Sequence, residues 1–109
     1  TPPSCSYEFF IGKEYCHSID IVQGGFIAAM LDAAMSHAAY AISEQILGVS
    51  TMEMSTRYMA PTHAGKILAL GQVISETYRT AFLEGRLHDI SGNLTATGHS
   101  TVKLTRKKK

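Results

Sequence analysis

Residues 24–46 read GGFIAAMLDAAMSHAAYAISEQI, and this stretch decides the fold. Seven of its residues are alanine, the strongest helix former, and apolar residues recur at helical spacing from Phe26 onward. We therefore expect one helix from about Gly24 to Ile46, ended by Gly48. Because this helix is apolar around most of its circumference, it should be largely buried. Its many alanines would allow a sheet to wrap closely around it.

The chain on either side of the helix shows the period of two that is typical of strands. A first strand is expected over residues 5–11, then a turn at residues 12–14 and an irregular approach to the helix over residues 17–23. Further strands are expected over residues 52–58, 66–76, 80–88 and 94–104, with a turn at residues 91–93. One buried helix followed by long antiparallel strands predicts an α+β domain whose sheet wraps the helix.

Two of these strands have clearly different faces. In the strand that ends before Pro61, one face carries Met52, Met54, Thr56 and Tyr58, and the other carries Glu53, Ser55 and Arg57. In the last strand, one face carries Leu94, Ala96, Gly98, Ser100, Val102 and Leu104. The small residues in its middle suit a strand that crosses close to a helix.

The composition narrows the class of protein. The 109 residues fit a single domain over residues 1–109, and the formal net charge of +1 gives no case for a nucleic-acid partner. The only basic run, residues 106–109, is expected to be a frayed, disordered tail. No apolar run reaches the ~20 residues of a membrane span, and the first residues do not resemble a signal peptide. We therefore expect a cytoplasmic protein.

The cysteine and histidine spacing gives no indication of a metal. Cys5 and Cys16 form neither a disulfide framework nor a metal motif, and are expected to be free thiols in a reducing compartment. No His or Cys spacing resembles a zinc site, so no metal is predicted. His37, alone on the helix, is more typical of a packed residue than of a ligand.

Three segments carry a resemblance to a known family. Residues 22–32, VQGGFIAAMLD, resemble the His-Gly-Gly…Asp signature of hotdog-fold thioesterases of the phenylacetate-degradation type. Residues 48–61, GVSTMEMSTRYMAP, resemble the strand that follows the helix in that family. Residues 78–82, YRTAF, resemble its Gly-Lys/Arg-Thr hairpin. The likeness covers about residues 15–105.

The resemblance implies a hotdog fold and the hydrolysis of an acyl-CoA to a free acid and CoA, with no cofactor beyond the CoA of the substrate. In matching positions the Gly24 amide would bind the oxyanion, Asp32 would be nucleophile or general base, and Ser50 would orient water or the carboxylate. The remaining implied contacts with substrate come from Gly25, Arg79, Thr80, Met54 and Tyr58. Two positions depart from the family: Gln23 replaces its His, and His17 replaces its frequent Asn. Both side chains can still donate hydrogen bonds.

The residues themselves give an independent view of Gly24 and Asp32. Gly24 would lie at a helix N-terminus, where free amides favour negative charge, although a Gly-Gly pair also marks an ordinary tight turn. Asp32 is the only carboxylate between Ile21 and Ser43, and its helical neighbours are small or apolar. An acid there is costly unless it is paired or lies at an open site. The alternative is a structural acid satisfied by the backbone or by Ser36.

The spacing of these two residues predicts a shared site. Gly24 and Asp32 are eight residues apart, about 12 Å along a helix. A reacting carbonyl must lie about 3 Å from both the nucleophile and the oxyanion donors, so one helix cannot supply both. Two antiparallel helices from two chains can. We therefore expect a homo-oligomer, a dimer or a dimer of dimers, whose site combines Gly24, Gln23 and His17 of one chain with Asp32 and Ser50 of the other.

Alternatives remain open from the sequence. The chain could bind acyl-CoA without turnover, or be a hotdog dehydratase, which the absence of a His directly before Gly24 disfavours. Arg79 is a candidate for the CoA phosphates, with a solvated strand-end charge as the equal alternative. Phe26, Met54 and Tyr58 could line either an aromatic or an aliphatic acyl pocket, so the acyl group is not specified.

Overall fold

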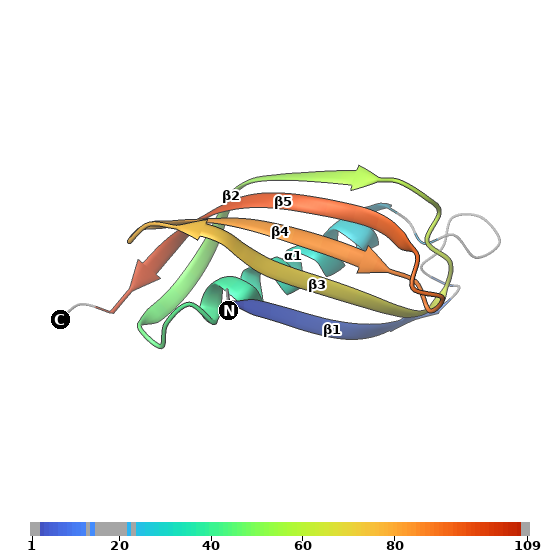
Figure 1. Ribbon diagram of the computed structural model, residues 1–109, viewed down its shortest axis with the longest axis horizontal. Coiled ribbons are helices and arrows are strands. Elements are labelled where there is room, and N and C mark those ends of the chain that lie inside the picture. The colour runs from blue at the N-terminus through green and yellow to red at the C-terminus, as the bar shows by residue number, and fades with distance from the viewer. Residues whose placement is uncertain (1–2, 13, 15–21, 23, 108–109) are drawn as a thin grey trace.

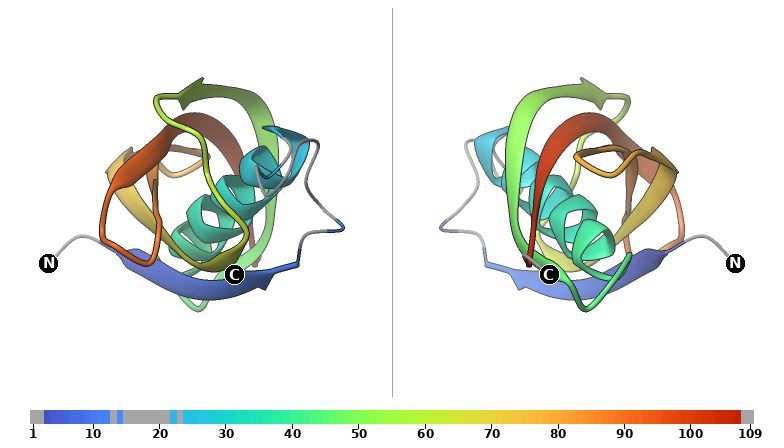
Figure 2. Two further views of the ribbon diagram at one scale, coloured as in Figure 1. Left: turned by 90° about the vertical axis from the view of Figure 1, so that its right-hand side faces the viewer. Right: turned by 90° about the vertical axis from the view of Figure 1, so that its left-hand side faces the viewer.

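The computed structural model describes residues 3–12, 14, 22 and 24–107. Its elements are β1 (Ser4–Ile11), α1 (Gly24–Tyr40), β2 (Ile46–Tyr58), β3 (Gly65–Glu76), β4 (Thr80–His88) and β5 (Leu94–Arg106). The strands form one antiparallel sheet in the order β1-β3-β4-β5-β2. The sheet curves around α1, which lies along its inner face (Figures 1 and 2). This is the expected α+β hotdog fold.

Helix α1 forms the centre of the core, as its apolar circumference predicts. Its buried residues are Ile27, Met30, Leu31, Ala34, Met35, Ala38 and Ala39. They pack against the inward side chains of all five strands, among them Ile67, Leu83, Leu87 and Val102. The three buried alanines keep the helix surface low, so the sheet can approach the helix closely.

A row of glycines lies where α1 crosses the sheet. Gly71 of β3 pairs with Gly85 of β4, which pairs with Gly98 of β5. A β-carbon added at Gly71 would overlap the backbone carbonyl of Ala34 in α1, and one added at Gly85 would stand 3.1 Å from a Leu31 methyl. The expectation of a close crossing near the middle of β5 is therefore confirmed, and it extends over three strands. We call Gly71, Gly85 and Gly98 the glycine row.

The helix ends earlier than expected. It stops at Tyr40 instead of Ile46, and Gly48 lies inside β2, where it pairs with Thr105 instead of ending the helix. A turn follows in which the Gln45 amide donates to the Ser43 hydroxyl, 3.1 Å away. The physical reason is tertiary packing. Ile46 is buried in the core and belongs to the strand pairing between β2 and β5, and this burial outweighs the local helix propensity.

The strand predictions hold with small shifts. β4 has the expected bounds, while β1 and β3 each begin one residue earlier than expected. β2 begins at Ile46 rather than Met52, and β5 continues to Arg106 rather than Leu104. Arg106 is therefore part of the sheet and not of a frayed tail. Residues 108–109, the turn residue Lys13 and most of the approach over residues 17–23 lie outside the described residues.

The turn between β4 and β5 occurs as expected, with Gly92 at a positive φ of 86°. The Asp89 carboxylate accepts the backbone N–H groups of Asn93 and Ser91 at 2.9 and 3.0 Å. These hydrogen bonds, chiefly that from Asn93, hold the pKa of Asp89 below its ordinary value.

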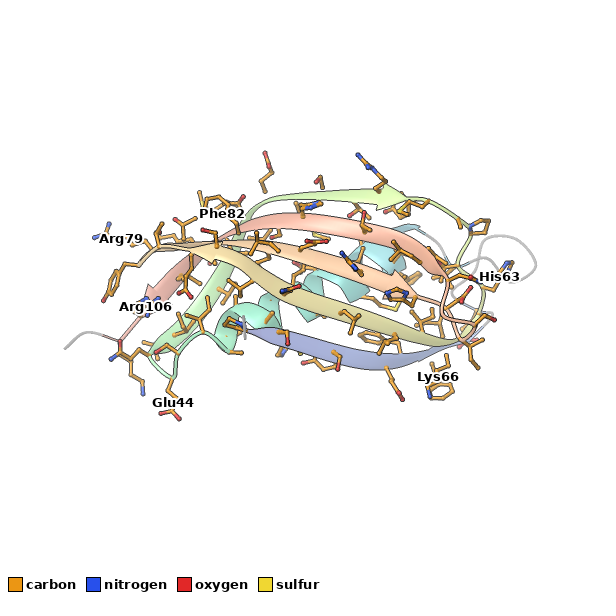
Figure 3. All side chains as sticks on the ribbon, in the orientation of Figure 1. Glu44, His63, Lys66, Arg79, Phe82 and Arg106 are labelled. Atoms are coloured by element: carbon orange, nitrogen blue, oxygen red, sulfur yellow. The ribbon has the colours of Figure 1, made fainter. Side chains whose placement is uncertain are left out.

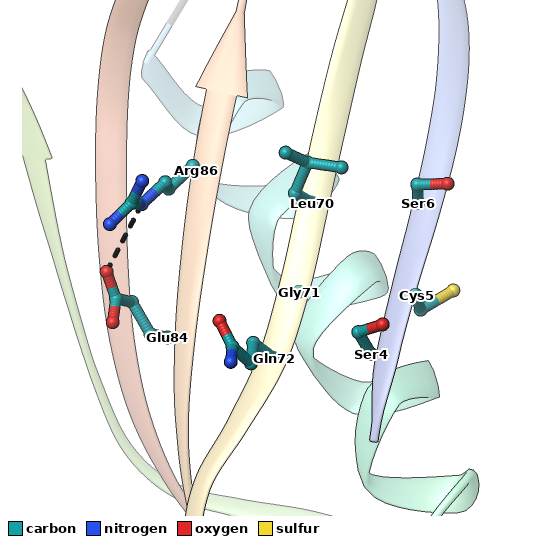
Figure 4. A pocket seen from close by; sticks show the side chains of 8 residues that line it. All are labelled: Ser4, Cys5, Ser6, Leu70, Gly71, Gln72, Glu84 and Arg86. Atoms are coloured by element: carbon teal, nitrogen blue, oxygen red, sulfur yellow. Dashed lines mark hydrogen bonds and ion pairs between the residues drawn. The ribbon is translucent and has the colours of Figure 1, made fainter. Parts of the chain in front are cut away.

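The outer face of the sheet carries a depression of about 490 Å³ across β1, β3 and β4 (Figure 4). Glu84 and Arg86 form an ion pair at its edge, at 3.3 Å. The helix lies on the opposite side of the sheet, so this depression is separate from the residues that the sequence singles out.

Candidate active site

Asp32 lies in the middle of α1, half-buried, and faces β2. Its Oδ1 accepts a hydrogen bond from the hydroxyl of Thr51, with 3.3 Å between the two oxygens. The hydrogen-bond donor to Asp32 thus lies on the adjacent strand. The sequence had suggested Ser36, on the same helix, as an alternative partner. A carboxylate that is held from one side and half-open on the other can still accept a proton from a ligand or water.

Ser50 does not share this position. It pairs with Lys103 of β5, and both residues are exposed on the outer face of the sheet. Thr51 pairs with Val102, which is fully buried beneath the helix. Since directly opposite residues of an antiparallel pair share a face, Thr51 points toward the helix and Ser50 away from it. The hydroxyl that contacts Asp32 within one chain is therefore that of Thr51, while the orienting role of Ser50 stays a prediction.

An irregularity in β2 explains why Thr51 and not Ser50 faces the helix. The pairing of β2 with β5 shifts between Thr51 and Glu53, so Met52 is an additional residue in the strand. A bulge of this kind reverses the alternation of side chains on one side of it. The expected alternation is correct from Glu53 to Tyr58, but continued back through Met52 it would place Ser50 on the inner face. Sequence periodicity alone carries no signal for the extra residue.

The start of α1 lies against the end of β2. The hydroxyl of Tyr58 donates a hydrogen bond to the Gly24 carbonyl oxygen at 2.9 Å. A β-carbon added at Gly24 would stand 3.2 Å from that hydroxyl, whereas one added at Gly25 would meet nothing within 4 Å. Gly24 is thus covered by Tyr58, whereas no described side chain covers Gly25.

The segment after β2 supports the same helix start. The amide of Val22 donates to the Thr62 carbonyl at 2.7 Å. Thr62 is buried, and its hydroxyl donates to that of Thr95 in β5 at 2.8 Å. Residues 58–62 therefore connect the sheet to the two described residues on either side of position 23. Together these elements line a groove of about 490 Å³. Its lining residues are Val22, Gly24, Ile27, Tyr58, Met59, Ala60, Pro61 and Thr62.

The remaining predicted site residues lie in different parts of the structure. Gln23 and His17 lie outside the described residues. Gly25 is exposed at the helix start, and Met54 is half-buried against the core. Tyr58 lines the groove at the helix start and donates a hydrogen bond to Gly24.

Arg79 lies in the hairpin between β3 and β4, at the opposite end of the molecule from His63 (Figure 3), and Thr80 is the first residue of β4. Thr80 closes the hairpin, because its amide donates to the Thr77 hydroxyl at 3.1 Å. The Arg79 carbonyl accepts a hydrogen bond from the Leu104 amide of β5 at 2.8 Å. Arg79 itself is exposed. The hairpin is thus fixed against the end of β5.

Arg106 belongs to the same end and was missed by the sequence prediction. Its guanidinium carbon lies 4.8 Å from the centroid of the Tyr78 ring, and its Nε donates to the Tyr78 carbonyl at 2.8 Å. A basic groove of about 330 Å³ lies here. It is lined by Tyr78, Arg79, Lys103, Leu104, Thr105, Arg106 and Lys107. The basic residues Lys103 and Arg106 of β5, which lie beside the hairpin, were its sequence signal.

The described part of the chain shows neither a metal-binding cluster nor a membrane-spanning helix. It contains no group of three or more His, Cys, Asp or Glu side chains arranged to hold a metal ion. None of its helical segments has the length and hydropathy of a membrane span.

Comparison with known families decides the relationship. The family model of the thioesterase superfamily matches residues 20–96, which contain both Gly24 and Asp32. The chain belongs to the thioesterase superfamily. Thioester hydrolysis is therefore its general class of activity. A comparison with curated proteins gave no significant match.

Solved structures agree with this membership. A phenylacetic acid degradation-related protein of Ralstonia eutropha superposes with a TM-score of 0.87 at 22% identity, over 94% of this chain and 76% of its own. Another solved protein of the thioesterase superfamily is 31% identical, with a TM-score of 0.80 over 93% and 74% of the two chains. A Bacillus halodurans protein solved with CoA is 20% identical, with a TM-score of 0.85 over 94% and 68%.

Proposed function

We propose that this thioesterase hydrolyses acyl-CoA thioesters at a site shared by two chains, with Asp32 as the essential carboxylate. The observation that carries the proposal is the setting of Asp32: half-buried in the middle of α1 and held by one hydroxyl from Thr51. A carboxylate placed in this way can accept a proton from water, which is what hydrolysis of a thioester requires.

The proposed reaction balances with water as the only co-reactant. A water oxygen adds to the thioester carbonyl carbon while Asp32 takes a water proton. The resulting oxyanion accepts hydrogen bonds from the amides at the start of α1, those of Gly24 and Gly25. The intermediate then breaks its C–S bond, and the departing CoA sulfur takes up the proton. If Asp32 attacks directly, an acyl anhydride on Asp32 forms first and water hydrolyses it. In single turnover in ¹⁸O-labelled water, label in Asp32 identifies an anhydride that water attacks at the Asp32 carboxyl carbon, whereas direct attack of water on the thioester places the label in the product acid.

Two chains are needed to complete this site. Gly24 and Asp32 both lie on α1, which is regular from Gly24 to Tyr40, so they are about 12 Å apart along its axis. An antiparallel pair of helices from two chains would bring the Gly24 of one chain to the Asp32 of the other. A dimer, or a dimer of dimers, is therefore part of the proposal. A cytoplasmic location is also part of it, in keeping with the free Cys5.

The basic groove is the proposed site for the CoA phosphates. It combines the exposed Arg79 with Lys103, Arg106 and Lys107, and Tyr78 provides an aromatic surface. Charged donors of this kind bind phosphate, and the ring suits a purine base. The related Bacillus halodurans protein was solved with CoA, which supports a CoA-containing substrate.

The function is tested by thiol release over short, medium, long and aromatic acyl-CoAs. Asp32→Asn keeps the shape of the side chain but cannot accept the proton, so kcat should fall by about two orders of magnitude or more. Folding should survive, as judged by melting temperature. Glu44→Gln, the same change at an exposed turn residue, is the matched control. Binding of acyl-CoA without turnover by the unmodified chain would instead identify a non-catalytic binding domain.

Arg79→Ala tests the basic groove. We expect KM for acyl-CoA to rise at low salt while kcat changes little, because the groove contacts a part of the substrate that does not react. Arg57→Ala, at an exposed outward position of β2, is the matched control. An unchanged KM for Arg79→Ala would remove this residue from the binding site.

A further inference from the structure

We propose that Tyr58 is a positioning residue for the oxyanion-binding amides, because its hydroxyl holds and polarises the Gly24–Gly25 peptide. The proposal rests on the proposed function for the identity of the reaction, but its structural part can be tested without turnover. It assigns to Tyr58 a role different from the substrate contact that the sequence suggested.

The placement of Tyr58 directs its side chain toward the start of the helix. Tyr58 is the last residue of β2 and pairs with Ala96 of β5, which is fully buried, so its side chain lies on the inner face of the sheet. Its hydroxyl donates to the Gly24 carbonyl oxygen at 2.9 Å. A side chain at position 24 would press on the hydroxyl and ring of Tyr58, at 3.2–3.4 Å. Glycine at position 24 therefore permits the contact with Tyr58 as well as any approach by a ligand.

The contact acts on a peptide group that can bind an anion. The Gly24 carbonyl and the Gly25 N–H are the two ends of one planar peptide. A donor at the carbonyl polarises that peptide and strengthens its N–H as a donor, since linked hydrogen bonds reinforce one another. Because the first N–H groups of a helix have no acceptor within the helix, the Gly25 N–H is available to a ligand. Among the described residues outside the helix start itself, none lies within 4 Å of a β-carbon placed at Gly25, so this side of the helix start offers room for a ligand.

A second hydrogen bond fixes the other side of the helix start. The Val22 amide donates to the Thr62 carbonyl at 2.7 Å, four residues beyond Tyr58 in the same segment. That segment is fixed to β5, because the Met59 amide donates to the Thr95 carbonyl at 2.9 Å. The sheet therefore holds the helix start on both sides of position 23. Tyr58 is the one of these contacts that a side-chain substitution can remove selectively.

The test uses Tyr58→Phe, which removes the hydroxyl and keeps the ring in the groove. We expect kcat to fall about five-fold or more with KM changed less than about two-fold, the scale of one lost hydrogen bond. We also expect the Gly25 amide proton to shift upfield in ¹H–¹⁵N spectra of the free protein, since its peptide is less polarised. Tyr40→Phe, at an exposed tyrosine on the last residue of α1, is the matched control and should change neither.

A purely structural role would lower the melting temperature and leave kcat and the Gly25 signal unchanged, which would overturn the proposal. If Tyr58→Phe fails to fold, Gly24→Ala provides the second variant: its β-carbon crowds the hydroxyl, and the same loss in kcat and upfield shift are expected. An unmoved Gly25 amide in that variant would also overturn the role.

The two proposals fail in different ways. Normal turnover by Tyr58→Phe together with an inactive Asp32→Asn would remove Tyr58 and leave acyl-CoA hydrolysis intact. Absence of hydrolysis by the unmodified chain would remove the function. The Gly25 amide shift would then decide the role of Tyr58 alone.

Discussion

Asp32 and Thr51 form the one side-chain contact between the proposed carboxylate and the sheet that the described residues show. A hydroxyl that donates to an ionised carboxylate orients it. Thr51→Val keeps the shape but removes the donor. We expect kcat to fall about ten-fold, near the lower end for a hydrogen bond to a charged group because the 3.3 Å distance is long. Steady-state kinetics with the best acyl-CoA measure it.

Two variants make this prediction sharp. Thr51→Ser should recover much of the activity, since the hydroxyl returns. Ser50→Ala should lower kcat less than Thr51→Val does, because Ser50 lies on the outer face beside Lys103. A larger loss in Ser50→Ala than in Thr51→Val would contradict the register-based assignment.

At the same scale, the sequence located part of the site and missed part of it. Gly24, Asp32 and Tyr58 stand out because each is an unusual residue in its local pattern or matches a family motif. Thr51 does not stand out: its relevance depends on the additional residue Met52 in β2, and one extra residue in a polar strand leaves no trace in composition or periodicity. Arg106 was missed because a basic run at a chain end is usually solvated.

Among the elements, the contact between α1 and β3 depends on the glycine row. Gly71→Ala should lower the free energy of unfolding by about 3 kcal/mol or more, since the added carbon overlaps the backbone of Ala34 and neither side can yield easily. Gly48→Ala is the matched control. A β-carbon there meets only the Thr105 side chain at an ordinary 3.7 Å, and alanine is favoured over glycine within a strand. Chemical denaturation of both variants measures the difference, and equal stabilities would argue against the close crossing.

The elements differ in how far the sequence predicts them. β4 and the turn after it follow from alternation and Gly92, which are local signals. The end of α1 does not, because Ala41 and Ile42 favour helix as strongly as the residues before them. The helix stops where Ile46 gains more from burial against the sheet than from another helical turn.

For the molecule as a whole, β2 lies at the edge of the sheet and pairs only with β5. A 13-residue edge strand leaves backbone donors and acceptors free for a second chain. It also carries exposed apolar side chains, among them Leu47 and Met52. We expect the protein to be a dimer or larger at micromolar concentration. Sedimentation velocity measures this, and a stable monomer with full thioesterase activity would exclude the shared site.

The strand order could not be read from the sequence. β1 pairs with β3 and β2 pairs with β5, so both edge strands join partners that are distant along the chain. Such pairings depend on which faces fit together around α1, not on local propensity. The class of fold was nevertheless predictable, because a 17-residue apolar helix needs a sheet long enough to enclose it.

The glycine row has one more consequence, for how substrate preference can change during evolution. The row touches α1 at Leu31, Ala34 and Met35, beside Asp32 and well away from Gly24. Because the crossing is tightest there, we expect a substitution that tilts the helix to move its two ends more than the carboxylate. Mutations near the groove at Gly24 can then reshape the space for the acyl group without displacing Asp32. We expect this lineage to acquire new acyl preferences through changes in residues 58–62, while retaining one unchanged hydrolytic carboxylate.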